Sequence, residues 1–169
     1  MVLHLVIRVI HVLFGVFWAG ATFFVALYLE PSVRETGQAG GAVMGALTRR
    51  GYPKALSIIA LLTVLTGLWL LWSVSGHFSG GYMGTPSGIL LSSGMLAGLL
   101  ALGVGVHMVK PVVNKLGAVA GRVAASGAPP SAEDQAEIQR LQGSLRLRVR
   151  IAAVLLLVAL VTMALGPHV

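Results

Sequence analysis

The sequence contains no cysteine and little charge. Of its 169 residues, 56% are hydrophobic and only 10% are charged, whereas a soluble globular domain carries about 25% charged residues. The absence of cysteine excludes disulfides, iron–sulfur clusters, thiolate zinc sites and cysteine nucleophiles. The shortage of polar residues excludes a water-soluble domain, because the chain could not cover its apolar surface. We therefore expect the lipid bilayer to cover this surface.

Acidic residues are also scarce, with five Asp and Glu against twelve Lys and Arg and a formal net charge of +7. A basic balance is typical of nucleic-acid binding, but the positions of these charges indicate a membrane orientation instead. No nucleotide-binding glycine loop, catalytic carboxylate pair or Ser-His-Asp signature is present. We expect no nucleic-acid partner, and the sequence leaves open whether the protein is an enzyme.

Long uncharged runs predict four membrane spans, since a bilayer requires about 20 apolar residues for each helical crossing. The expected spans are residues 2–29, 55–75, 87–109 and 151–167. The first run continues well beyond the length of a signal peptide's apolar region, so we interpret it as an anchor. The predicted fold is all-α: one transmembrane domain over residues 1–169, folded as a four-helix bundle.

The basic residues predict the orientation of this bundle. All but one of the twelve lie in the segments 30–54 and 110–150, and the connection from 76 to 86 has none. The positive-inside rule places the two basic segments in the cytoplasm. We therefore expect a multi-pass protein of the inner (plasma) membrane with both termini outside.

An amphipathic cytoplasmic helix is expected over residues 132–150. Ser131 precedes Glu133 and Asp134 in an N-cap arrangement, and apolar residues then recur at helical spacing as far as Val149. Such a helix lies against the inner membrane surface or runs straight into the fourth span. Its last basic side chains are expected to extend to the headgroups: Arg146, Arg148 and Arg150.

The first span carries the residues with the clearest chemical potential. His4, Arg8 and His11 are spaced four and three apart, so they lie within about 60° of one another on a helix. Such side chains are costly against lipid, so we expect them to face the bundle interior or a hydrated cavity. In one interpretation only His11 is inside, hydrogen-bonded to a neighbour. In the other, His11 binds a metal or haem iron and Arg8 neutralises a propionate.

A second axial ligand would have to lie at a similar depth. At 1.5 Å per residue, His11 lies about 13 Å below the outer end of its span and His107 about 30 Å below the end of the third. Met95 and Met163 lie at about 12 Å and about 9 Å, so a His–Met pair is open to either methionine. Methionine at such positions is more often a packing residue.

Histidines on the outer side form a further candidate. His77 and His168 share that side with His4, so their imidazoles could converge on a zinc or copper ion, with His77 as one ligand. The ordinary alternative is a solvated surface histidine.

Small residues recur along the third span at Gly94, Gly98, Ala101 and Gly105. This pattern predicts close helix packing. Three residues of the second span could face it, with the two hydroxyls bonding to backbone carbonyls: Thr63, Thr66 and Gly67.

The segment HVLFGVFWAGATFF, with His11, Trp18 and Gly20, is similar to the first helix of a group of small four-helix membrane proteins. The group includes the copper resistance protein D family and the membrane-type protoporphyrinogen oxidases. RRGYPKALSIIALLTVLTGLWLL and HMVKPVVNKL resemble the group's second span and the segment after its third. The resemblance implies a haem, porphyrin or copper site around His11.

Three functions from different classes follow as hypotheses. The first is a membrane redox protein for electron transport that binds haem b or a porphyrin around the first helix. The second is a cofactor-free accessory subunit of a larger membrane complex or a homo-oligomer. The third is a copper-handling membrane protein.

Overall fold

The computed structural model describes residues 2–169, without the side chain of Gln38. The first rod is continuous from α1 (Val2–Phe24) through a π-helical turn, η1 (Val25–Leu29), into α2 (Glu30–Thr36). Helix α3 (Gln38–Arg49) then leads to α4 (Tyr52–Val74).

The second half of the chain contains two longer rods. After the short α5 (Gly80–Met83), α6 (Pro86–Gly103) continues through the π-helical turn η2 (Val104–Val109) into α7 (Lys110–Ser126). Helix α8 (Ala132–Leu165) returns and ends in the 3₁₀ turn η3 (Gly166–His168). Within the described residues, four helical rods are long and apolar enough to cross a membrane, which confirms the all-helical fold and the four predicted helices.

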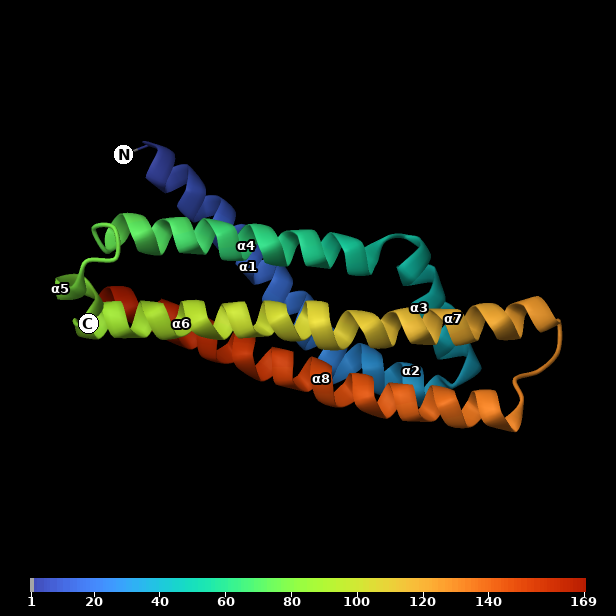
Figure 1. Ribbon diagram of the computed structural model, residues 1–169. Helices are drawn as coiled ribbons and strands as arrows, with labels where there is room; N and C mark the ends of the chain where they lie inside the picture. Colours follow the sequence, from blue (N-terminus) through green and yellow to red (C-terminus); the bar gives the residue numbers. More distant parts are fainter. Residues whose placement is uncertain (1) are drawn as a thin grey trace.

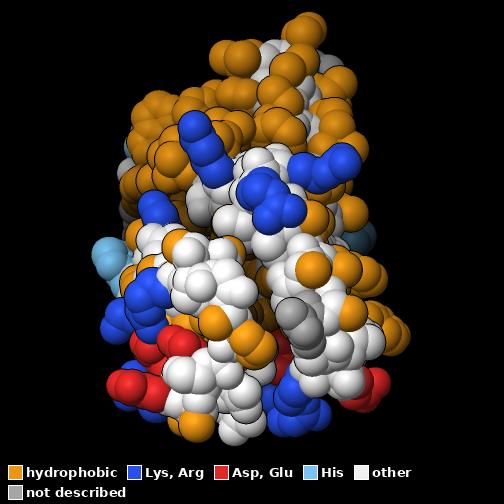
Figure 2. Space-filling model, turned by 90° about the vertical axis from the view of Figure 1, so that its right-hand side faces the viewer, with side chains coloured by type: hydrophobic (Ala, Val, Ile, Leu, Met, Phe, Trp, Pro, Cys, Tyr) orange, Lys and Arg blue, Asp and Glu red, His pale blue; other side chains and the backbone are white. Residues whose placement is uncertain are grey.

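The rods are arranged so that both termini and α5 lie at one end of the molecule, while α2, α3 and the α7–α8 turn lie at the other (Figure 1). The α6–α7 rod packs along α8, and α4 packs against both α1 and α6. Helix α1 crosses behind α4 (Figure 1). The two basic segments expected on one side of the membrane therefore share one end of the molecule. Figure 2, which views this end, shows Lys and Arg side chains gathered there with apolar side chains beyond them.

Two π-helical turns carry rods past prolines that would otherwise break them. Each turn ends two residues before a proline: Leu29 before Pro31 and Val109 before Pro111. Proline has no N–H to donate, and its ring clashes with the carbonyl four residues earlier in an α-helix. A wider turn relieves that clash, so the helix continues. The third rod therefore extends to Ser126.

The start of α8 confirms the predicted N-cap. The Ser131 hydroxyl accepts a hydrogen bond from the Asp134 backbone N–H (3.1 Å), and the Asp134 carboxylate accepts one from the Ser131 N–H (3.2 Å). This reciprocal pair satisfies two of the backbone donors that a helix start leaves open. Because α8 then continues unbroken, the amphipathic segment runs straight into the fourth apolar run, as one of the two interpretations proposed.

The core has two parts. The first joins α1, α4, α6 and α8 through one large side chain among small ones: Trp18, Ala19, Ala60, Val64, Ala101 and Leu156. The second joins η1, α7 and α8 toward the basic end of the molecule: Ala26, Val112, Val119, Leu141, Leu145 and Val149. The segment between the last two predicted spans is thus a packed helical hairpin.

Candidate functional site

His11 lies on the face of α1 that packs against α4. Its Nδ1 donates to the backbone carbonyl oxygen of Thr63 at 2.9 Å and lies 3.3 Å from the Thr66 hydroxyl oxygen. A carbonyl oxygen only accepts, so Nδ1 carries the proton in the neutral imidazole and Nε2 keeps its lone pair. Nε2 makes no hydrogen bond within the described chain. The imidazole is thus oriented by one nitrogen and has the other available.

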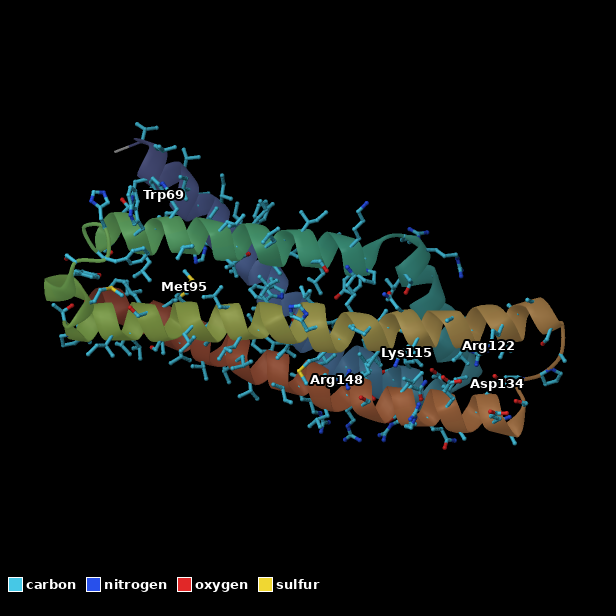
Figure 3. The ribbon with its side chains drawn as sticks, viewed as in Figure 1. Trp69, Met95, Lys115, Arg122, Asp134 and Arg148 are labelled. Atoms are coloured by element: carbon cyan, nitrogen blue, oxygen red, sulfur yellow. The ribbon has the colours of Figure 1, made fainter. Side chains whose placement is uncertain are left out.

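Gly67 allows this approach, because it lies one turn after Thr63 and has no side chain. A Cβ atom on Gly67 would lie 2.7 Å from His11 Cε1 and 3.2 Å from the methyl carbon of Met95. Met95 comes from α6, is 7% exposed and lies between α6 and α4 (Figure 3). The structure therefore brings His11 and Met95, two of the predicted ligands, to the same position on α4.

The pair offers an imidazole nitrogen and a thioether sulfur. Haem iron accepts this combination in cytochromes c, and Cu(I) favours thioether sulfur and also accepts imidazole. A single methyl carbon on Gly67 would already be too close to the His11 ring. The contact between α1 and α4 therefore has no room for a porphyrin at Gly67 unless α1 moves away from α4.

Arg8 does not share the packed face, which agrees with the interpretation that only His11 lies inside and differs from the expectation that all three residues face the interior. It is exposed and lines a shallow hollow on the face of α1 that points away from the bundle. Its neighbours there are apolar and include Leu5 and Val9. The physical reason is that α4 covers a narrow strip of α1 centred on His11, and Arg8 lies about 60° around the helix. His4 remains on the covered side, where its ring packs against Trp69 with the centroids 5.8 Å apart.

The remaining candidate ligands lie apart from this pair. Met163 packs α8 onto α6, since its Cγ would be 2.9 Å from a Cβ on Gly94. His77 has a positive φ of 65° and stacks on Trp72 with ring centroids 4.3 Å apart, while His107 is exposed. Within residues 2–169, no three His, Asp or Glu side chains come together in a way that could hold a metal.

The small-residue pattern of the third span produces the close packing that was predicted, but against α8 rather than against α4. Gly94 faces α8, where a Cβ would lie 2.6 Å from the Thr162 hydroxyl oxygen. Thr63 and Thr66 turn toward His11 of α1 rather than toward the glycines of α6. Sequence reasoning missed the Thr63 carbonyl and the role of Gly67, although a glycine one turn after a threonine in an apolar helix is a signal for close approach.

Comparisons of the chain with protein-family models, with curated proteins and with solved structures find no match.

Proposed function

We propose that this chain is a multi-pass protein of the plasma membrane with both termini outside. The four apolar rods and the basic end formed by α2, α3 and the α7–α8 hairpin support this orientation. Because the sequence has no cysteine, single cysteines at the exposed positions Gly41, Ser79 and Ala128 can be labelled without background. We expect Ser79→Cys to react with an impermeant reagent from outside and the other two from the cytoplasm. Labelling of Ser79→Cys from the cytoplasm would refute the orientation.

We further propose that the protein binds a redox-active metal centre through His11 Nε2, with Met95 as the second ligand. The observation that carries the proposal is the hydrogen bond from His11 Nδ1 to the Thr63 carbonyl. Metal-ligating histidines commonly donate their other N–H to such a carbonyl, which fixes the ring and its tautomer. A copper(I) ion accepts imidazole nitrogen and thioether sulfur and needs less room than a porphyrin, while the resemblance of the first span favours haem b, which requires α1 to part from α4.

Metal analysis and the visible spectrum of the purified protein test this function. A Soret band identifies haem, and stoichiometric copper without that band identifies a copper protein. His11→Gln keeps a donor that can reach the Thr63 carbonyl but removes the imidazole, so it should abolish binding in a folded protein. Met95→Leu should weaken binding at nearly constant volume.

Three matched variants serve as controls for these changes. Met163→Leu makes the same substitution at the α6–α8 contact, His107→Ala removes a histidine in η2, and Arg8→Ala removes a charge from the uncovered face of α1. All three should leave the bound metal unchanged. Loss of the metal in His107→Ala with retention in His11→Gln would refute the site, as would a protein that binds neither haem nor copper.

The accessory-subunit hypothesis is supported by a different observation, the exposure of Arg8 on the apolar outer face of α1. A charged side chain in a span is costly against lipid and usually pairs within protein or reaches the headgroups. If a partner subunit covers this face, Arg8→Leu should release it from the complex, as measured by native electrophoresis of gently solubilised membranes. An unchanged complex size with Arg8→Leu would contradict this function.

A further inference from the structure

A groove between α7 and α8 gathers basic side chains at the inner end of the molecule. It has a volume of about 210 Å³, and its lining includes Lys115 on α7 with Arg140, Ser144 and Arg148 on α8. The three α8 residues are four apart, so they follow one face of the helix. Lys115 and Arg148 lie where the two helices run side by side (Figure 3). The groove therefore offers three cationic groups and one hydroxyl from two rigid helices.

The charges of the groove lack carboxylate partners. In residues 2–169 the ion pairs are those that join Arg122 to Glu137 at 2.9 Å and to Asp134 at 3.5 Å. Arg122 thereby occupies the two acids that lie nearest the groove in sequence. Neither Lys115 nor Arg140 makes a side-chain hydrogen bond within the described residues, whereas Arg148 donates to the Met108 carbonyl oxygen at 2.6 Å. Uncompensated positive charge thus remains in a concave site.

The end of the groove nearest the apolar runs lies at the depth of lipid headgroups. At 1.5 Å per residue, Arg148 precedes the apolar run that starts at Ile151 by about 5 Å, and Lys115 follows the run that ends at Val109 by about 9 Å. The headgroup layer extends about 5–8 Å beyond the hydrocarbon on each side. Arg140 precedes Ile151 by about 16 Å, so it lies on the aqueous side of this layer. Basic pockets between membrane helices on the cytoplasmic side are suited to the phosphates of acidic lipids.

We propose that this groove binds a phosphate group, supplied by the headgroup of an acidic phospholipid of the inner leaflet. Arg148, oriented by the Met108 carbonyl, presents its remaining N–H groups at the membrane surface, where guanidinium groups bind phosphate oxygens in pairs. Lys115 and Arg140 add charge from the two walls, and the Ser144 hydroxyl adds a neutral donor. The assignment to the inner leaflet rests on the proposed orientation of the chain, whereas the site is separate from the His11–Met95 pair and does not depend on metal binding.

The test compares three probes on the full-length protein in a neutral detergent: short-chain phosphatidylglycerol, phosphatidylcholine of the same chain length, and inorganic phosphate. A ligand that binds only the folded protein raises the thermal midpoint with its concentration, which gives its dissociation constant. We expect phosphatidylglycerol to raise the midpoint and phosphatidylcholine to have no effect. An equal response to inorganic phosphate would assign the same phosphate site to a soluble source.

Two double variants decide whether the groove is responsible. Lys115→Gln with Arg140→Gln should weaken phosphatidylglycerol binding by about five- to 25-fold, since each basic residue near an acidic surface contributes about fivefold and Arg140 lies farther from that surface than Lys115. Neither side chain makes an internal hydrogen bond, so the variant should fold. Arg49→Gln with Arg50→Gln removes the same charge beside α4 and should change affinity less than about threefold. Equal losses in both pairs, or no binding of phosphatidylglycerol or phosphate by the native protein, would overturn the proposal.

Discussion

Two glycines one turn apart on α6 should respond in opposite ways to the same substitution. In Gly94→Ala, the new methyl would lie 2.6 Å from the Thr162 hydroxyl oxygen and 2.9 Å from Met163 Cγ. The threonine cannot easily yield, because its hydroxyl is already bonded to the carbonyls of Val158 (2.9 Å) and Ala159 (3.2 Å) on α8. Overpacking of this kind costs about 1–3 kcal/mol.

Gly98→Ala is the matched control, since Gly98 is buried on the same helix and a Cβ there would have no neighbour within 4 Å. The substitution should leave stability within about 0.5 kcal/mol or raise it, because alanine favours the helix by up to about 1 kcal/mol. Equilibrium unfolding in mixed micelles, with increasing sodium dodecyl sulfate, measures both free energies. Equal destabilisation by the two variants would show that the packing of α6 on α8 is not as described.

Four further predictions concern other parts of the structure. Gly67→Ala should displace the His11 ring, because the new Cβ would be 2.7 Å from Cε1. The bound metal should therefore be lost. Retention of the metal with an unchanged visible spectrum would contradict the site. Ser131→Ala should reduce the free energy of unfolding by about 0.5–2 kcal/mol, because α8 loses its cap. The same unfolding assay measures this loss, and an unchanged free energy of unfolding would argue against the cap. The pKa of Asp134 lies below its ordinary value because the Ser131 hydroxyl donates to its carboxylate at 2.8 Å; the resulting stability is present above about pH 3.9 and is lost as the pH falls through the lower folded pKa. Ser131→Ala should weaken this acid dependence in thermal scans without abolishing it, because the backbone N–H of residue 131 and Arg122 still bond the carboxylate. An identical pH profile would assign the dependence to another group. A protein with Gly105 deleted from η2 and with Pro111→Ala should fold better than one with Gly98 deleted, because a π turn holds one residue more than an α turn. The yield of folded protein in size-exclusion chromatography measures the difference. Equal losses of folded protein would contradict the explanation of η2.

The four apolar rods were predictable because the bilayer imposes their length and composition wherever they pack. The cap at Ser131 was predictable as well, since it depends on neighbouring residues alone. The orientation of Arg8 was not, because periodicity fixes only the angle between side chains on one helix. Which of His4, Arg8 and His11 is covered depends on how α1 crosses α4, and the sequence of α1 does not contain that information.

Helices α3 and α7 were missed for a related reason. Their sequences are rich in glycine and alanine and carry scattered charge, so no long apolar run marks them. In the structure α7 is stabilised from outside, by packing of Val112 and Val119 on α8 and by the Arg122–Glu137 ion pair. The His11–Met95 pair was partly predictable from depth alone, but the choice of Met95 over Met163 follows from helix packing around Gly67.

The two prolines connect these observations. Pro31 and Pro111 stand where the first and third rods leave their apolar runs, a position that would normally end a membrane helix. The π turns before them let both rods continue, and the extra residue in each turn rotates the following segment relative to a plain α-helix. For the third rod, that rotation brings Val112 and Val119 onto α8 and leaves Lys115 at the wall of the basic groove. The proline thus matters less as a helix breaker than as the residue that determines which face of α7 meets α8.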